Sequence, residues 1–186
     1  PCDPEAIRAR MSERLLARAP HVTNVPDGIL TAANACTMND GAAFVALASE
    51  DWVKAHGARP MAEIKAVRIA GGDAACPPLM ADQAVSQLLS REGLSYEDVD
   101  AFEYNEAFAV ISADFIKRHP SVKDRLNRWG GALAYGHPYG ASGAEIMIHL
   151  MAILQQGNGR YGVCAIPAAG GVAEAILIEN KIGRDA

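Results

Sequence analysis

One stretch of the chain decides its fold, and it reads Gly130-Gly131-Ala132-Leu133-Ala134-Tyr135-Gly136-His137-Pro138-Tyr139-Gly140-Ala141-Ser142-Gly143-Ala144. It places one histidine, His137, between glycines and a proline, directly before an apolar run at residues 145–154. Glycine lets the backbone and a ligand approach closely, and Pro138 stiffens the turn. Because the run is apolar on nearly every side, it predicts a buried helix and not an amphipathic one. An imidazole at the buried N-terminus of a helix is a candidate site whose charged form is disfavoured.

The segments around this stretch alternate between strand and helix patterns. Alternation predicts a strand at residues 63–70, and apolar residues at helical spacing predict a helix at residues 79–91. The remaining expected elements are a strand at 100–104, a helix at 108–119 and paired strands at 160–166 and 172–178. Closer to the N-terminus we expect a helix at 4–19, a turn at 25–28, a strand at 42–49 and a helix ending near Gly57. Such alternation predicts a layered α/β domain.

The composition excludes several classes of protein. The chain has 186 residues, half of them apolar, and a formal charge of -5, so nucleic acid is not expected as an obligate partner. The longest apolar run is too short to span a membrane, and the N-terminal segment lacks signal-peptide character. The four cysteines are widely spaced without a Cys-x-x-Cys pair, which indicates neither a metal site nor a disulfide framework. A reducing, cytoplasmic location is therefore expected.

Four blocks of sequence, in order along the chain, resemble the thiolase family. Residues 31–43 resemble its Asn-Ala-Ser…Asn-Asp-Gly-Ala-Ala segment, and residues 105–109, Asn105-Glu106-Ala107-Phe108-Ala109, resemble its Asn-Glu-Ala-Phe loop. Residues 130–144 resemble its Gly-His-Pro motif, and residues 161–179 resemble its closing pair of strands. The resemblance implies the C-terminal half of the α/β thiolase fold, with α-β-α layers, a mixed sheet and a buried central helix. Residues 59–186 would form this catalytic domain, and residues 1–58 the last piece of the N-terminal domain.

The resemblance also implies a chemistry. Thiolases join or cleave acyl units held as coenzyme A thioesters, without a separate cofactor, and a nucleophilic cysteine carries the acyl group. His137 would activate that cysteine and donate into an oxyanion hole, and Asn105 would fix a water in the same hole. The alternative interpretations are a hydrogen-bonded turn histidine for His137 and a turn residue after a strand for Asn105.

Further residues are expected around this centre by the same resemblance. Glu106 would orient the site through hydrogen bonds, and Phe108 would form part of the pocket wall. Cys36 stands where the family has a serine that contacts the pantetheine arm of coenzyme A, although core packing explains a cysteine equally well. Pro138 would lie beside the substrate. His149 has no family motif around it, and its place in the apolar run predicts a hydrogen-bonded core histidine and not a second base.

The sequence departs from the family at the second catalytic cysteine. An ungapped alignment places that acid/base at Pro167, which cannot exchange a proton. A gap would assign the role to Cys164, but an odd offset along a strand points to the opposite face. Ala169 still offers a backbone N–H for the oxyanion hole. Trp129 replaces a family asparagine, which suggests a remodelled pocket wall.

The family nucleophile lies in the N-terminal half, and no cysteine of this chain sits in a matching loop. The predicted strand at residues 42–49 would belong to a sheet whose other strands are absent from the chain. We therefore expect a hetero-oligomer with a separate chain that carries the N-terminal half and the nucleophilic cysteine. The alternative is a fragment of a longer protein.

Three functions remain open at this point. The first is a thiolase-like acyltransferase that makes or cleaves a carbon–carbon bond between acyl-CoA units. The second is a related condensing enzyme that needs no strong base, such as one that acts by decarboxylation. The third is a non-catalytic structural subunit of a thiolase-like complex.

Overall fold

The computed structural model describes residues 12–22 and 28–183. Its helices are α1 (Glu13–Arg18), α2 (Glu50–His56), α3 (Met80–Glu92), α4 (Ala109–Arg118), α5 (Ala132–Tyr135) and α6 (Ser142–Gly157). Its strands are β1 (Ala62–Gly71), β2 (Ala101–Tyr104), β3 (Tyr161–Ala168) and β4 (Val172–Asn180). Most of the turn predicted at residues 25–28 and the first part of the helix predicted at 4–19 lie outside the described residues, as does Cys2.

The four strands form one mixed sheet in the order β1-β4-β3-β2. β1 and β3 both pair antiparallel to β4, whereas β2 pairs parallel to β3. The parallel pair needs a long crossover connection, and α4, α5 and α6 lie within it. β3 and β4 form a hairpin, which confirms the paired strands predicted from the sequence.

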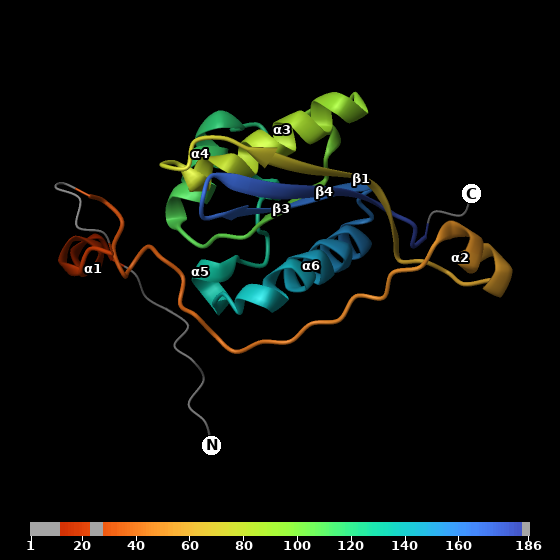
Figure 1. Ribbon diagram of the computed structural model, residues 1–186, viewed down its shortest axis with the longest axis horizontal. Helices are drawn as coiled ribbons and strands as arrows, with labels where there is room; N and C mark the ends of the chain where they lie inside the picture. The colour runs from red at the N-terminus through yellow and green to blue at the C-terminus, as the bar shows by residue number, and fades with distance from the viewer. Residues whose placement is uncertain (1–11, 23–27, 184–186) are drawn as a thin grey trace, which may run out of the picture.

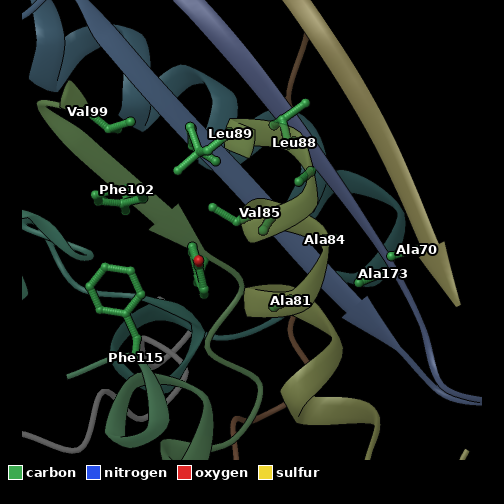
Figure 2. Close-up of a cluster of buried hydrophobic side chains, with 14 of the residues drawn as sticks. Ala70, Ala81, Ala84, Val85, Leu88, Leu89, Val99, Phe102, Phe115 and Ala173 are labelled. Atoms are coloured by element: carbon green, nitrogen blue, oxygen red, sulfur yellow. The ribbon is translucent and has the colours of Figure 1, made fainter. Parts of the chain in front are cut away.

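Helices cover both faces of the sheet (Figure 1). α3 and α4 lie on one face, and α6 with the short α5 lies on the other. The layered α/β arrangement predicted from the alternating pattern is confirmed. Figure 2 shows the larger of two apolar clusters, in which Val85 and Leu88 of α3 meet Phe102 of β2 and Phe115 of α4.

Alternation along β2 decides which side chains reach the site. Phe102 and Tyr104 belong to the cluster under α3 and α4, whereas Ala101 belongs to the cluster under α6. Because successive strand residues point to opposite faces, Glu103 points toward α6, and it is fully buried there. The strand ends at Tyr104, so Asn105 is the first residue at the open end of the sheet.

Two predictions from the sequence are wrong. Residues 42–49 form no strand, and Phe44 and Leu47 are 93% and 76% exposed. Within residues 12–22 and 28–183, no strand lies beside this segment to complete a ladder. The helix α6 is also not buried all round: Leu150 is buried against the sheet, but Ile148 on another face is 37% exposed. An apolar sequence predicts burial of the whole helix, and this chain covers only one side of it.

The described helices include none with the length and apolar character needed to cross a membrane.

Candidate functional site

His137 lies in the turn between α5 and α6 and is held at three points. Its backbone N–H donates to Thr37 O at 2.9 Å. Its Nδ1 lies 2.7 Å from Ser142 Oγ, and its Nε2 lies 3.2 Å from Asn105 Nδ2. Ser142 is the first residue of α6 and is buried. The imidazole is therefore fixed between the start of α6 and the end of β2.

These contacts define the protonation of the ring. An amide nitrogen only donates, so Asn105 Nδ2 donates to an unprotonated Nε2. The ring proton then sits on Nδ1 and is donated to Ser142 Oγ. Burial lowers the pKa of His137, because desolvation disfavours the imidazolium. The ring is thus a neutral base whose lone pair at Nε2 meets the Asn105 amide.

Asn105 is positioned by the sheet. Its backbone N–H donates to Ala165 O of β3 at 2.9 Å, which continues the parallel ladder by one bond beyond β2. The whole residue is only 2% exposed. An asparagine in a solvated turn after a strand would be exposed, so this burial favours a role at the His137 ring.

The segment at residues 31–40 runs across both site loops and ties them together. Cys36 N donates to Ala107 O at 2.8 Å, and Ala109 N donates to Asn34 O at 2.9 Å. Further along, Met38 forms a bridge to His137. The two motifs that lie about thirty residues apart in sequence are therefore joined both directly and through this segment.

Gly136 shows how closely that segment approaches. Its φ is +97°, which an L side chain rarely adopts. A Cβ built on Gly136 would overlap the side-chain amide of Asn39. Glycine is required immediately before His137 both for the backbone conformation and for the space that Asn39 occupies.

The other residues of the Asn-Glu-Ala-Phe loop surround the centre without touching His137 in any described hydrogen bond or ring contact. Burial raises the pKa of Glu106, and a Cβ on Gly131 would meet Glu106 Oε2 at 2.8 Å. Phe108 precedes α4 and forms a bridge with Ala35. Cys36, next to Ala35, is half-buried. These residues hold the Asn-Glu-Ala-Phe loop in contact with the segment at 31–40 and with the turn before α5.

The β3–β4 hairpin carries the position of the expected second cysteine. Pro167 is half-buried opposite Ala173, and Ala169 is exposed in the turn. Cys164 lies in the apolar cluster under α6, where burial raises the pKa of its thiol to about 12. A thiol that stays protonated and buried is poorly suited to take a proton near neutral pH.

Two cavities lie on the α6 side of the sheet. One, of about 460 Å³, is lined mainly by apolar groups of β1, β3, β4 and α6, and it also includes Cys164 and the carboxyl residue Glu174. The other, of about 400 Å³, is lined by Trp129, Tyr135 and His149 among others, and shares Pro138 with the site. Trp129 therefore forms a wall of the second cavity. The prediction of a hydrogen-bonded His149 is wrong within the described residues, because its buried Nδ1 has no partner there.

Sequence reasoning missed Ser142, which contacts His137, and Glu103, which lies on β2 ahead of the Asn105 loop. Ser142 lies inside the stretch quoted first, and its place at the start of the apolar run is the signal that could have revealed it. Glu103 is fully buried, and neither carboxyl oxygen has a hydrogen-bond partner in the described part of the chain. Burial raises its pKa to about 8, and the nearby Glu106 adds to this. Glu103 lies two residues before Asn105 on a strand whose side chains alternate between the two faces of the sheet. This spacing is the sequence signal that could have revealed it.

Comparisons with known proteins agree on one family. Residues 58–180 match the family described as Thiolase, C-terminal domain. Acetyl-CoA acetyltransferase of Saccharomyces cerevisiae is 41% identical over 180 residues, which cover 92% of this chain and 44% of that protein. Mitochondrial acetyl-CoA acetyltransferase of Bos taurus is 42% identical over 154 residues, 83% of this chain and 36% of that protein.

The structural comparison gives the same result. The crystal structure of the Bacillus anthracis acetyl-CoA acetyltransferase has a TM-score of 0.85 and 32% sequence identity, covering 93% of this chain and 44% of that chain. The chain thus spans less than half the length of the relatives it matches.

Proposed function

This chain belongs to the thiolase family, and on that premise we propose that it forms the C-terminal half of an acyl-CoA C-acyltransferase active site. The nucleophilic cysteine comes from the N-terminal half, carried by a separate chain in a hetero-oligomer. Residues 59–186 act as the catalytic domain, and residues 1–58 complete the N-terminal domain. The observation that carries this proposal is the His137 ring, neutral and held between Asn105 and Ser142.

The geometry supports two roles for the His137 ring, first as a base and then as a hydrogen-bond donor to an oxyanion. With its proton on Nδ1, the ring takes the proton of the incoming thiol at Nε2. The thiolate attacks the thioester carbonyl, coenzyme A leaves as the thiolate and takes a proton from solvent, and an acyl group remains on the cysteine while the proton stays on Nε2. Nε2 with a proton and a water held by Asn105 Nδ2 then face the oxygen of a second thioester, where each donor contributes about 3–4 kcal/mol.

Uncovered apolar surface supports a missing half. On β1, Val67 and Ile69 are 49% and 64% exposed, and on α6 Ile148 is 37% exposed. All three residues belong to β1 or α6, the elements that line or flank the two cavities. They lie on the side of the sheet that α6 covers only in part. Phe44 and Leu47 are exposed as well, and exposed apolar side chains on this side of the domain are suited to pack against another part of a protein.

The assignment of His137 is tested in the purified assembly with His137→Ala. We expect acetoacetyl-CoA thiolysis and acetyl-CoA condensation to fall by roughly 10²–10⁴-fold, as for removal of a general base. His56→Ala is the matched control, because His56 lies exposed on α2. Unchanged activity in the His137 variant would exclude the proposed role.

The separate chain is tested by native mass spectrometry of the protein purified from its own cells. We expect a second polypeptide with a reactive cysteine in stoichiometric amount. A single longer polypeptide that contains this sequence would contradict the two-chain arrangement and leave the assignment of His137 intact.

A second candidate function is favoured by Pro167 and the inert Cys164. Without a second proton acceptor, a condensing enzyme that generates its carbanion by decarboxylation avoids the missing step. Release of CO₂ from malonyl-CoA without 3-ketoacyl-CoA thiolysis would favour this candidate. Pro167→Cys is expected to raise thiolysis if the ungapped alignment is correct; loss of activity in Cys164→Ala, without that gain, would favour the gapped one.

We place the protein in the cytoplasm as part of this proposal. The names of its relatives include both cytosolic and mitochondrial proteins, so cell fractionation decides the compartment. The alternative of a non-catalytic subunit is disfavoured by the burial of Asn105 at the His137 ring.

A further inference from the structure

The residue that follows the His137-Pro138 pair has a backbone conformation that is costly for its side chain. Tyr139 has a φ of +34°, in the left-handed region, which a bulky residue rarely adopts. Such conformations persist only where the surrounding structure fixes them, and they cluster at functional sites. The proposed reaction gives Tyr139 no role that would explain this strain.

Contacts on both sides of Tyr139 hold the turn in place. Ala141 N donates to Pro138 O at 3.0 Å, which closes the turn directly before α6. On the other side, a Cβ on Gly41 would lie 2.6 Å from Pro138 Cγ, so the segment after residue 40 lies directly against the proline. The Tyr139 backbone therefore cannot relax without disturbing these contacts.

The strained turn places the Tyr139 ring against the His137 ring. Their centroids are 4.6 Å apart and their planes meet at 44°. In the part of the chain that the structure describes, no other aromatic side chain contacts the His137 ring. Tyr139 is 64% exposed, so burial in the core does not account for its position. The contact with the imidazole is the interaction that the strained backbone secures.

His137 carries a positive charge during the proposed reaction. Its Nδ1 is already protonated when Nε2 takes the proton of the thiol, so the ring becomes an imidazolium and remains one in the acyl-enzyme. Burial disfavours this charge. The side chains that hydrogen-bond to the ring, Asn105 and Ser142, are both neutral. They orient the ring and supply no negative charge.

Within residues 12–22 and 28–183, no carboxylate compensates the charge by direct contact. The elements around the turn carry titratable groups, which are Glu103 and Glu106 at the end of β2, Tyr135 on α5, Asp40 beside Gly41 and Glu145 on α6. None of these groups forms a hydrogen bond or an ion pair with the His137 ring. The imidazolium therefore needs a stabilising partner of another kind.

We propose that Tyr139 is a positioning residue that acts through His137: its aromatic ring stabilises the imidazolium while the acyl group is transferred. An aromatic ring attracts a cation within about 6 Å of its centroid, and the two rings meet this condition. At an exposed site the attraction corresponds to a gain of about 2- to 5-fold in proton affinity. Tyr139 forms and breaks no bond, and the proton still passes from the thiol sulfur to Nε2. The inference rests on the proposed function for the moment at which the charge appears.

The first arm of the test measures the contact without catalysis. The full chain is isotopically labelled in its histidines, and the His137 ring signals are followed by NMR as the pH changes. In Tyr139→Leu we expect the titration midpoint of His137 to fall by about 0.3–0.7 pH units, which is the loss of about 2- to 5-fold in proton affinity. Tyr139→Phe keeps the ring and should keep the midpoint. The His56 signals, from the exposed helix α2, are the internal control.

Two results of this arm would overturn the proposal. One is a His137 midpoint that is the same in Tyr139→Leu as in the wild type, because the ring would then not stabilise the charge. The other is a Tyr139→Phe variant that behaves like Tyr139→Leu, which would assign the effect to the phenol hydroxyl. Tyr139→Met provides a second apolar side chain without a ring, so the test does not depend on the folding of one variant.

The second arm uses the assembled protein and measures kcat/KM for acetoacetyl-CoA thiolysis across pH. In Tyr139→Leu the acidic limb should move to lower pH by about 0.3–0.7 pH units. The plateau should fall by up to about 5-fold, because a weaker base takes the thiol proton more slowly. A lower plateau with an unmoved limb and an unmoved NMR midpoint would indicate contact with the substrate and overturn the proposal. Unchanged activity in His137→Ala would exclude the proposed function, whereas the first arm would still decide whether Tyr139 stabilises the charged ring.

Discussion

Glu103→Gln tests whether the chain holds a neutral carboxylic acid beneath its candidate site. Glu103 is fully buried on β2 without a hydrogen-bond partner among the described residues. Burial raises its pKa from 4.5 to about 8. The folded protein therefore holds this proton more tightly than the unfolded chain does.

The sign and size of the effect follow from proton linkage. A raised carboxyl pKa contributes stability at low pH, and that contribution is lost as the pH rises from about 4.5 to about 8. Since one pKa unit corresponds to about 1.4 kcal/mol, the loss between pH 5 and pH 8.5 amounts to about 4 kcal/mol. The neutral amide of the Glu103→Gln variant has no proton to lose over this range.

The assay is urea unfolding of the wild type and the variant at pH 5, 7 and 8.5. The free energy of unfolding of Glu103→Gln relative to wild type should increase by about 4 kcal/mol from pH 5 to pH 8.5. Titrating groups that do not interact with Glu103 contribute equally to both proteins and cancel in this difference. Glu92→Gln, an exposed carboxyl on α3, should show no such trend. A change below about 1 kcal/mol in the Glu103 comparison would show that the carboxyl is ionised or solvated in the fold.

Three further predictions concern the site. Ser142→Ala removes the partner of His137 Nδ1 and should lower kcat by roughly 5- to 30-fold, for a loss of about 1–2 kcal/mol; an unchanged pH–rate profile would show that the hydroxyl does not position the ring. Gly136→Ala should destabilise the fold by about 1–3 kcal/mol or more in thermal unfolding, because its φ is +97° and its space is occupied, whereas Gly140→Ala, with nothing within 4 Å, should be nearly neutral. Cys164 should resist a thiol-specific reagent at pH 8 until the protein unfolds, since its pKa is about 12; rapid modification in the native state would contradict its burial.

The sequence was sufficient to predict the elements of the α/β layers. Regular apolar spacing predicted α3, and alternation predicted β1, because both elements bury one face against the same sheet. The parallel pairing of β2 with β3 was not predicted, since no local pattern shows which strands are neighbours, and the family resemblance implied only a mixed sheet. The thiolase fold itself is confirmed by the structural comparison.

The two wrong predictions about the fold share one physical cause. Residues 42–49 and the exposed side of α6 have sequences that suit burial, but the surfaces that would bury them are not part of the described chain. A local sequence pattern shows that a segment is suited to burial. It does not show whether the same polypeptide contains the surface that would bury it. The roles of Ser142 and Glu103 were not predicted for another reason. The turn geometry that brings Ser142 Oγ to His137 Nδ1 and the lack of a partner for the Glu103 carboxyl among the described residues are both set by the folded structure.

The most direct measurement is to locate the acyl group during turnover. The purified assembly is mixed with acetyl-CoA, quenched in acid and digested, and acetylated cysteines are mapped by mass spectrometry. We predict a thioester on a cysteine that lies outside these 186 residues, and its disappearance in the His137→Ala assembly. An acetyl thioester on Cys2, Cys36, Cys76 or Cys164 would show that this chain carries its own nucleophile, and it would contradict an active site shared between two chains.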